Sequence, residues 1–347
     1  MEENEQCIAL GIRPCVVTFS ALLKCISESK AAASVGEASL SCCLQAEAIL
    51  DDMERRYQAG DTNAKPNQIS FTLAMKTCFR AGNLIKADAI MRRMEASDTP
   101  PDIRTYSDIL QHYSQMGTAA CAERTEQILD YMKELGTTNP SLKPNVYSYT
   151  IVLNAWAFSG DPDAAHRMWR IYELMKRDGV AMDVVFSTSL ITFLAKIKTR
   201  KSLERAVFIL QEMERSPDVD LRPGPRQYGA IMKGFINAGD VERATLVMLR
   251  SVEAYVNGQN DGAKPLPFAF HLVATAWIRT GELVKATLFL DKMQELYESK
   301  RIPIGPSLGT YNTLLSCWGA SRHPKKTMYA TKLESKIAAL HSDGFLS

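Results

Sequence analysis

The sequence predicts an all-α protein built as one α-solenoid of about eight helix-turn-helix repeats. Three observations predict this fold. One sequence motif recurs throughout the chain: an aromatic residue, a small polar residue, a pair of aliphatic residues, a bulky apolar residue and then Gly. The apolar residues of each copy are spaced at 0, +4 and +7, which is one face of a helix. Most copies also finish on Pro followed by a variable residue, and proline ends a helix.

The first helix of each repeat is predicted from its apolar stripe. The eight copies start at Val16, Gln68, Ile103, Val146, Val184, Pro225, Pro267 and Leu308. The fourth residue is aromatic in seven of the eight copies, and the eighth and eleventh residues are almost all bulky and apolar. Five copies place Gly at the fifteenth residue, where a left-handed backbone ends the helix without a Cβ clash: Gly82, Gly117, Gly160, Gly239 and Gly281.

A second helix follows directly in each copy. Ala stands at its crossing point and lets two backbones approach, at Ala87, Ala165, Ala206, Ala244 and Ala286. Met stands near its end, at Met53, Met94, Met132, Met175, Met213 and Met293. Each repeat is therefore predicted to be a compact helical hairpin whose aromatic and Met stripes are core.

The domain organisation follows from the repeats. We expect an N-terminal extension over residues 1–15, one solenoid over 16–342 without an interior boundary, and a short tail over 343–347. Only Gln68 to Asp102 has the uninterrupted length of 35 residues. The insertions in other copies, notably Ser29 to Leu40 and Asn257 to Ala263, are rich in small or polar residues and are expected in solvent.

Composition narrows the classes of function. With 46% apolar and 23% charged residues the chain should fold, and its net charge of +2 favours no partner strongly. It contains no uncharged apolar run long enough to span a membrane, and its acidic start resembles no targeting signal. The eight cysteines are expected to be reduced packing residues. The five histidines lack metal-ligand spacing, and no phosphate loop or nucleophile motif appears, so we expect neither a metal, a cofactor, a small-molecule substrate nor catalysis.

From about Val16 to about Leu340 the repeats resemble the pentatricopeptide-repeat family, as a P-type array. The aromatic-plus-polar start and the Pro-Asp or Pro-Asn ending carry the resemblance, whereas tetratricopeptide repeats favour an early Trp and a Leu-Gly pair. The resemblance implies a right-handed solenoid in a mitochondrion or plastid that binds single-stranded RNA on a surface lined by the first helices. Each repeat would face one base, a known mode of recognition for unpaired RNA.

The fifth residue of each repeat follows the aromatic and is expected to point away from the buried face. The resemblance pairs it with the last residue of the same repeat, and Ser or Thr with Asn implies adenine while Thr with Asp implies guanine. The expected base-reading pairs are Ser20 with Asn67, Thr72 with Asp102, Ser107 with Asn145, and Thr150 with Asp183. These four repeats are predicted to read 5′-A-G-A-G-3′. Thr188 with Gly224 suggests a weak purine preference, Asn312 hints at a pyrimidine, and repeats six and seven carry no base assignment.

Two further sets of residues are candidates for contact with RNA. The second residue of each repeat is implied to stack against bases where it is apolar, at Val17, Ile69, Tyr147, Val185 and Phe268. The thirteenth place holds the candidate phosphate contacts Arg80, Lys196 and Arg279. The alternatives are that the polar fifth residues are only helix caps and that the three cations belong to a solvated face.

Three hypotheses of function follow. The first is a sequence-selective binder of single-stranded organellar RNA that supports processing, stability or translation and works with other RNA-processing proteins. The alternative is a protein-interaction scaffold in an organellar ribonucleoprotein or ribosome complex. A third hypothesis makes the chain the RNA-binding part of a larger enzyme.

Overall fold

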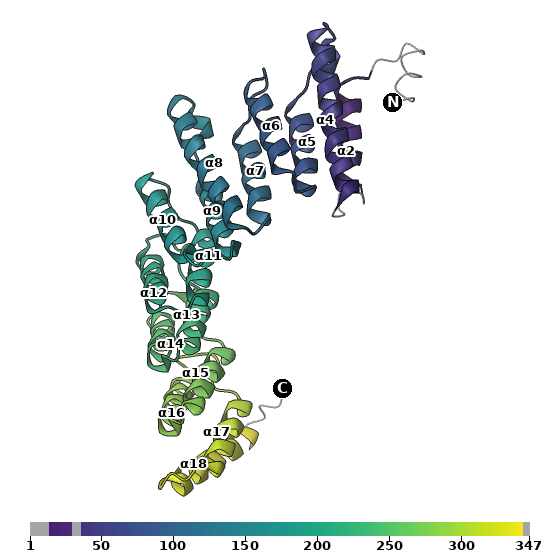
Figure 1. The fold of residues 1–347 in the computed structure, drawn as a ribbon. Coiled ribbons are helices and arrows are strands. Elements are labelled where there is room, and N and C mark those ends of the chain that lie inside the picture. Colours follow the sequence, from purple (N-terminus) through teal and green to yellow (C-terminus); the bar gives the residue numbers. More distant parts are fainter. Residues whose placement is uncertain (1–13, 30–35, 343–347) are drawn as a thin grey trace. The chain divides into compact units, whose positions relative to one another are not determined.

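The computed structural model describes residues 14–29 and 36–342, and the fold of these residues is entirely helical. They form sixteen α-helices and three short 3₁₀ helices, with no strand in the described ranges (Figure 1). The predicted all-α fold is confirmed. The expected extension and tail lie almost wholly outside the described residues, as do residues 30–35 of the first insertion.

The helices alternate between two kinds. The first helices of the repeats, helices A, are α2 (Val16–Glu28), α5 (Gln68–Arg80), α7 (Ile103–Gln115), α9 (Val146–Phe158), α11 (Val184–Lys196), α13 (Pro225–Asn237), α15 (Pro267–Arg279) and α17 (Leu308–Ala320). The second helices, helices B, are α4 (Glu37–Gln58), α6 (Leu84–Glu95), α8 (Ala119–Thr138), α10 (Ala164–Arg177), α12 (Arg200–Arg215), α14 (Val241–Val256), α16 (Leu283–Glu298) and α18 (Lys326–Ser342). Every helix A begins at the residue that the repeat pattern predicted as a repeat start.

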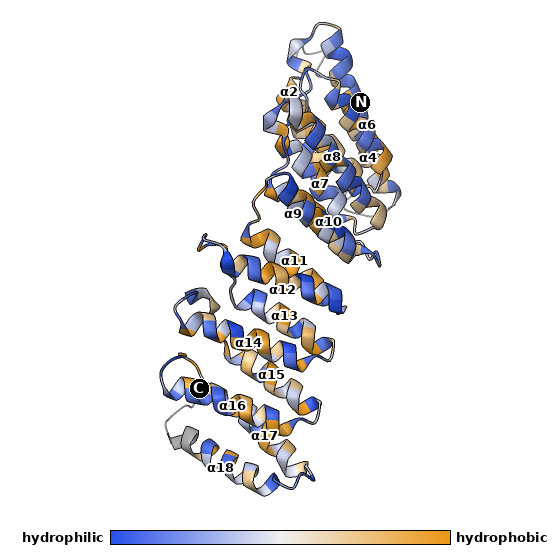
Figure 2. Cartoon of the chain, turned by 90° about the vertical axis from the view of Figure 1, so that its left-hand side faces the viewer, coloured by the Kyte–Doolittle hydropathy of each residue, from blue (hydrophilic) through white to orange (hydrophobic). Residues whose placement is uncertain are grey.

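The chain groups into two compact units, one up to Ala164 and one from Ala165 onward. In the first unit α5 packs against α2, α4, α6 and α7, and α9 packs against α7 and α8. In the second unit α13 packs against α11, α12, α14 and α15, and α17 packs against α15, α16 and α18. Helices α11 to α16 lie side by side, and each carries both hydrophobic and hydrophilic residues (Figure 2). Within each unit, a helix A therefore contacts its own helix B and the helices of neighbouring repeats.

The predicted stripes form the core. The six predicted Met residues of the helices B are completely buried, and so are most fourth-position aromatics. Two tryptophans at the eleventh place of helix A satisfy their indole N–H in the neighbouring helix B. Trp277 donates to Thr245 Oγ1 at 2.9 Å, and Trp318 donates to Thr287 Oγ1 at 2.9 Å. The core thus joins successive repeats through apolar packing and through matched polar atoms.

The glycine prediction is confirmed by backbone geometry. The five glycines at the fifteenth place have φ between +64° and +83°, the left-handed region in which a residue with a Cβ is strained. Each stands just after helix A and turns the chain into helix B.

The expectation that the insertions lie in solvent holds for only part of each. In the first insertion Glu37, Ala38 and Leu40 are exposed at the start of helix α4, whereas Ser39 is buried. In the second insertion, Asn260 and Ala263 are buried and a 3₁₀ helix spans Asp261–Ala263. Asn260 Nδ2 donates to the carbonyl of Pro223 at 2.7 Å, which ties the insertion to the end of the preceding repeat. A polar segment is buried here because its amide finds a backbone partner. Two similar 3₁₀ helices, Thr62–Ala64 and Pro140–Leu142, occupy the corresponding connections in repeats one and three.

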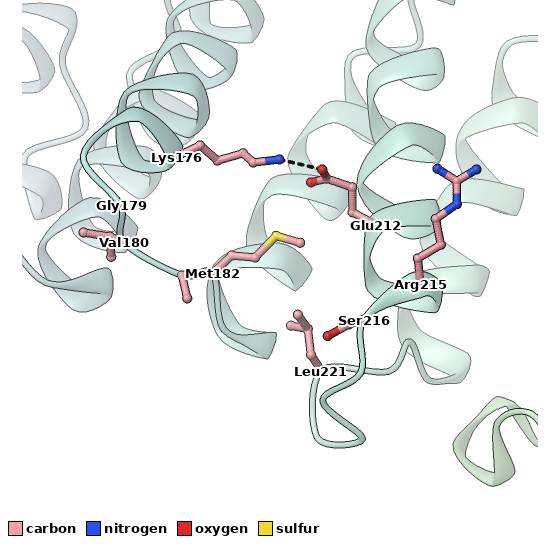
Figure 3. Close-up of a pocket in the computed structure, with 9 residues that line it drawn as sticks. Lys176, Gly179, Val180, Met182, Glu212, Arg215, Ser216 and Leu221 are labelled. Atoms are coloured by element: carbon pink, nitrogen blue, oxygen red, sulfur yellow. Dashed lines mark hydrogen bonds and ion pairs between the residues drawn. The ribbon is translucent and has the colours of Figure 1, made fainter.

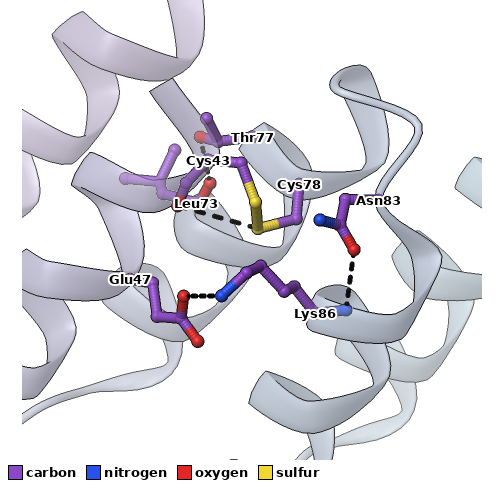
Figure 4. Close-up of a disulfide and its surroundings, with 7 residues drawn as sticks. All are labelled: Cys43, Glu47, Leu73, Thr77, Cys78, Asn83 and Lys86. Carbon is purple, nitrogen blue, oxygen red and sulfur yellow. Dashed lines mark hydrogen bonds and ion pairs between the residues drawn. A yellow bond between two sulfur atoms is a disulfide. The ribbon is translucent and has the colours of Figure 1, made fainter. Parts of the chain in front are cut away.

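The expectation that all cysteines are reduced is also wrong. Cys43 of α4 and Cys78 of α5 form a disulfide, with their Cα atoms 4.7 Å apart (Figure 4). The two residues are 35 positions apart in the sequence, so no local motif marks them as a pair. Packing of helix B against the next helix A brings them within bonding range. Both are completely buried, beside the ion pair of Lys86 and Glu47.

Candidate nucleic-acid interface

The second residues of the helices A are exposed in all eight repeats. Five of them are apolar, and their exposed fractions are 71% for Val17, 59% for Ile69, 54% for Tyr147, 62% for Val185 and 65% for Phe268. The other three are Arg104, Arg226 and Gly309. Large apolar side chains presented to solvent at a fixed repeat position are typical of a contact surface, because scattered exposure would follow no register.

The hydroxyl groups of the fifth residues bond back to their own helix. Thr72 Oγ1 donates to the carbonyl of Gln68 at 2.7 Å, and Ser107, Thr150 and Thr188 make the same bond to the residue four places earlier. This bond is common for Ser and Thr inside helices. Because the hydroxyl hydrogen is occupied, the oxygen is left as a hydrogen-bond acceptor.

The expectation that the fifth residues point away from the buried face is wrong for two of them. Ser107 is 7% exposed and Thr150 is 6% exposed, whereas Thr72, Thr188 and Ser20 are partly exposed. Helix α7 packs against α5 on one side and α9 on the other, so neighbouring repeats cover a residue that a single helix would expose. The Oγ of Ser20 is buried and makes no hydrogen bond within the described part of the chain. Asn312 is exposed.

The last residues of the first four repeats cap the following helix A. Asn67 Oδ1 accepts from the backbone N–H of Ser70 at 2.9 Å, and Asp102 Oδ1 accepts from that of Thr105 at 2.8 Å. Asn145 and Asp183 make the same N-cap bond, at 3.0 and 2.7 Å. The helices A are therefore capped by the last residues of the preceding repeats, and not by the fifth residues.

Capping uses only one of the two polar side-chain atoms of each partner. The second polar atom is Nδ2 in Asn67 and Asn145 and Oδ2 in Asp102 and Asp183, and the described residues offer it no hydrogen bond. An amide nitrogen is a donor and a carboxylate oxygen is an acceptor. The repeats are thus of two chemical kinds, which differ in whether the last residue keeps a donor or an acceptor beyond its cap bond.

The first three pairs lie wholly within the first unit. The fourth pair is divided, because Thr150 belongs to the first unit and Asp183 to the second. The fifth pair, Thr188 and Gly224, lies in the second unit.

The predicted cations are exposed, and two of them have other contacts. The guanidinium of Arg80 donates to the carbonyl of Ser27, and the ammonium of Lys196 lies 5.1 Å from the centre of the Phe193 ring. Arg279 is exposed at the end of α15. These contacts still leave charge at the surface of helix A.

A further set of polar residues was missed from the sequence. The ninth residue lies one turn after the fifth and is Lys in three repeats, at Lys24, Lys76 and Lys233. Lys24 and Lys233 are exposed, and Lys76 is partly exposed. The sequence spacing could have revealed these lysines, because positions two, five, nine and thirteen of a repeat lie on one face of a helix.

His112 of α7 is close to this face but adds no charge. Burial, followed by the neighbouring charges of Lys76 and Arg80, lowers the pKa of His112 to about 4. Its ring stacks on that of Phe79, with centroids 5.0 Å apart. His112 is therefore neutral near pH 7.

A pocket in the second unit includes Met182, the residue before Asp183, in its lining. It is lined by the connection after α10 and by the end of α12 (Figure 3). Lys176 and Glu212 neutralise one another across it at 2.6 Å, and the hydroxyl of Tyr172 also donates to Glu212. Arg215 is the remaining charged residue of its lining. Within the described ranges, no helix is both long and apolar enough to cross a membrane.

The fold and the site define a helical-repeat protein that presents one exposed second residue per repeat and a polar pair in most repeats. A family model described as the pentacotripeptide-repeat region of PRORP matches residues 4–138. This match supports the pentatricopeptide-repeat family for the chain.

Curated relatives carry the same family name. A pentatricopeptide repeat-containing protein of Arabidopsis thaliana is 25% identical over 247 residues, which cover 71% of this chain and 38% of the relative. A mitochondrial one from the same plant is 19% identical over 76% of this chain and 45% of its own, and a chloroplastic one is 23% identical over 61% and 27%. The chain spans less than half the length of these relatives.

Two solved structures are similar to this chain. The pentatricopeptide repeat protein PPR10 in complex with an 18-nt psaJ RNA element is 19% identical, with a TM-score of 0.47, over 97% of this chain and 42% of that one. PPR10 from maize is 15% identical, with a TM-score of 0.38, over 97% and 56%.

Proposed function

We propose that this chain binds single-stranded RNA, with one base per repeat. The observation that carries the proposal is the register of exposed apolar second residues, each three places before the fifth residue of its repeat. An apolar side chain beside a polar pair gives a base one surface for its face and one for its edge. Stacking is tolerant of sequence, whereas hydrogen bonds to the Watson–Crick edge select the base.

The proposed base identities follow from the polar atom that capping leaves over. Beside the acceptor oxygen of Thr or Ser, the Nδ2 of Asn67 or Asn145 adds a donor, which matches the N6 amino group and the N1 acceptor of adenine. The Oδ2 of Asp102 adds a second acceptor, which matches the N1–H and N2–H donors of guanine. The first three repeats are therefore proposed to read A-G-A, and the guanine of the fourth repeat comes from the sequence alone.

The biological setting is proposed from the family. Relatives are named mitochondrial and chloroplastic, which supports an organellar role in RNA processing, stability or translation. We propose that this part of the protein contributes binding and not chemistry, and that other RNA-processing proteins act on the bound transcript.

The test is binding of the purified chain to fluorescent single-stranded RNA containing A-G-A-G within a uridine context. Controls are the same strand with those purines changed to pyrimidines, and a duplex. Selective binding to the first strand is expected, with a shallow dependence on salt, because only a few cations lie on the helix A face. Equal binding to all three, or binding to none, would overturn the proposal.

A protein-interaction scaffold is the second candidate, and one observation favours it. On the helices B of the second unit, Phe208 is 44% exposed, Leu246 63% and Leu288 57%, away from the helix A face. Replacing all three by Ser should leave RNA binding unchanged. If the triple variant instead loses RNA, these residues serve the RNA surface and this second candidate fails.

A further inference from the structure

The fifth repeat lacks a side chain at its last position, because residue 224 is Gly. In repeats one to four the last residue is Asn or Asp, which caps the next helix A and keeps a second polar side-chain atom. The structure fills the corresponding place in repeat five with a different side chain, that of Gln227. This is the third residue of the following helix α13, and it is 5% exposed.

The amide of Gln227 bridges the two members of the incomplete pair. Its Nε2 donates to Thr188 Oγ1 at 2.7 Å, and its Oε1 accepts from the backbone N–H of Gly224 at 2.9 Å. One Nε2 hydrogen is used in this way, and within the described residues the second has no hydrogen-bond partner. A carboxamide that accepts a backbone N–H through its oxygen and keeps an N–H donor is also what Asn67 provides at the start of α5.

In the seventh repeat, too, the third residue of the following helix contacts both the fifth and the last residue of the repeat. Thr310, the third residue of α17, lies 3.1 Å from Nδ1 of His271 and 2.9 Å from the hydroxyl of Ser307, which are the fifth and last residues of that repeat. In repeats one to three the third residue of the next helix bonds only to the last residue, through Ser70, Thr105 and Ser148. The bridge to the fifth residue is thus confined to repeats whose last residue is Gly or Ser.

Resting on the proposed function, we propose that Gln227 is the second base-reading residue of repeat five and that this repeat selects adenine. The hydroxyl hydrogen of Thr188 is held by the carbonyl of Val184 and one lone pair of its oxygen accepts from Gln227, so the second lone pair accepts from the N6 amino group. The free Nε2–H of Gln227 then donates to N1. Guanine presents a hydrogen at N1, which would oppose this donor.

The test measures binding of the full chain to four RNAs that carry A-G-A-G followed by A, G, C or U, by fluorescence anisotropy. The wild type should bind the adenine strand about fivefold more tightly than the guanine strand, the size of one net hydrogen bond. Gln227→Glu keeps the acceptor for Gly224 N–H but replaces the donor by an acceptor, and it should reverse the preference to guanine. Gln227→Met, which lacks both, should abolish it.

A rescue and a matched control separate base reading from packing. A Cβ at Gly224 would meet the Gln227 oxygen at 3.6 Å and the Gly262 carbonyl at 3.7 Å, which are ordinary contacts. Gly224→Asn in the Gln227→Met background should therefore restore the adenine preference. Gln294, 8% exposed on α16, is the control, and Gln294→Glu should not alter base preference.

Two kinds of failure are distinguishable. If A-G-A-G is selected but the fifth nucleotide is unselected, or if its preference is the same in Gln227→Glu and Gln227→Met as in the wild type, the role of Gln227 is overturned while the proposed function stands. If purines at the first three positions are not selected either, the proposed function falls and this inference falls with it.

Discussion

Asp102 combines two roles that a pair of substitutions can separate. Its Oδ1 accepts from the backbone N–H of Thr105 at 2.8 Å and from the Thr105 hydroxyl at 2.9 Å, and its Oδ2 is proposed to face the second base. Asp102→Asn preserves an oxygen for the cap and replaces the free acceptor by a donor. Asp102→Ala removes both. Stability and base preference should therefore respond differently to the two variants.

The size of each effect follows from the contacts. Asp and Asn are about equal as N-caps, so Asp102→Asn should change the free energy of unfolding by less than about 0.5 kcal/mol. Asp102→Ala removes the cap, which stabilises a helix by about 1 kcal/mol, and it leaves the buried Thr105 hydroxyl without its acceptor. The free energy of unfolding should therefore fall by roughly 1–3 kcal/mol. For RNA, Asp102→Asn should weaken binding of guanine at the second position about tenfold, or about 1.4 kcal/mol, and favour adenine there.

Urea unfolding and fluorescence anisotropy with RNAs that differ only at the second nucleotide measure the two effects. Asp240, which caps helix B α14 through Arg243 N–H at 3.0 Å, is the matched control, and Asp240→Asn should leave base preference unchanged. If Asp102→Asn destabilises the protein as much as Asp102→Ala, the capping argument is wrong. If Asp102→Asn keeps its guanine preference, Oδ2 does not contact the base.

Three further predictions concern other parts of the first unit. The folded-state pKa of His112, about 4, lies below its ordinary value of 6.5, so the unfolded chain takes up the proton first and stability falls as pH drops from 6.5 towards 4. From this group the free energy of unfolding of the wild type should be about 2 kcal/mol lower at pH 5 than at pH 7.5, whereas His112→Gln should lack that decrease. Identical pH profiles of unfolding for the two proteins would refute this prediction. Tyr147→Ser should weaken RNA binding by roughly 1–3 kcal/mol without base preference, while Ile85→Ser, at an 85% exposed helix B residue, should not; equal effects would contradict the stacking role. Because the Cys43–Cys78 bond spans 35 residues, reductant should lower unfolding free energy by up to roughly 4 kcal/mol in wild type but not in Cys78→Ser, and an equal response of both would disprove the link.

Much of the fold was accessible from the sequence because its signals are local. The aromatic of the fourth place, the Gly of the fifteenth and the closing Pro each act within a few residues, through helix periodicity and backbone dihedral preference. The starts of all eight helices A follow from them. The register of the second residues is equally local, and their exposure accords with that register.

Part of the candidate site depended on contacts between repeats. Ser107 occupies the same place as Thr72, yet Ser107 is buried and Thr72 is partly exposed, a difference that the repeat pattern does not contain. The sequence allows the Ser and Thr of the fifth position to be helix caps. In the structure the N-caps are instead their Asn and Asp partners, because an N-cap residue directly precedes the first residue of helix A. The pairing of Gln227 with Thr188 joins residues 39 positions apart.

The sequence by itself determined where each helix begins, which face of it is apolar and which positions carry polar pairs. These properties arise from hydrogen bonds and torsions between residues close in the chain. Only the tertiary structure decided which polar atoms are left after capping, that Gln227 stands where Gly224 has no side chain, and that Cys43 meets Cys78. The contacts of Gln227 with Thr188 and of Cys43 with Cys78 join helices of successive repeats, and they span 39 and 35 positions of the chain.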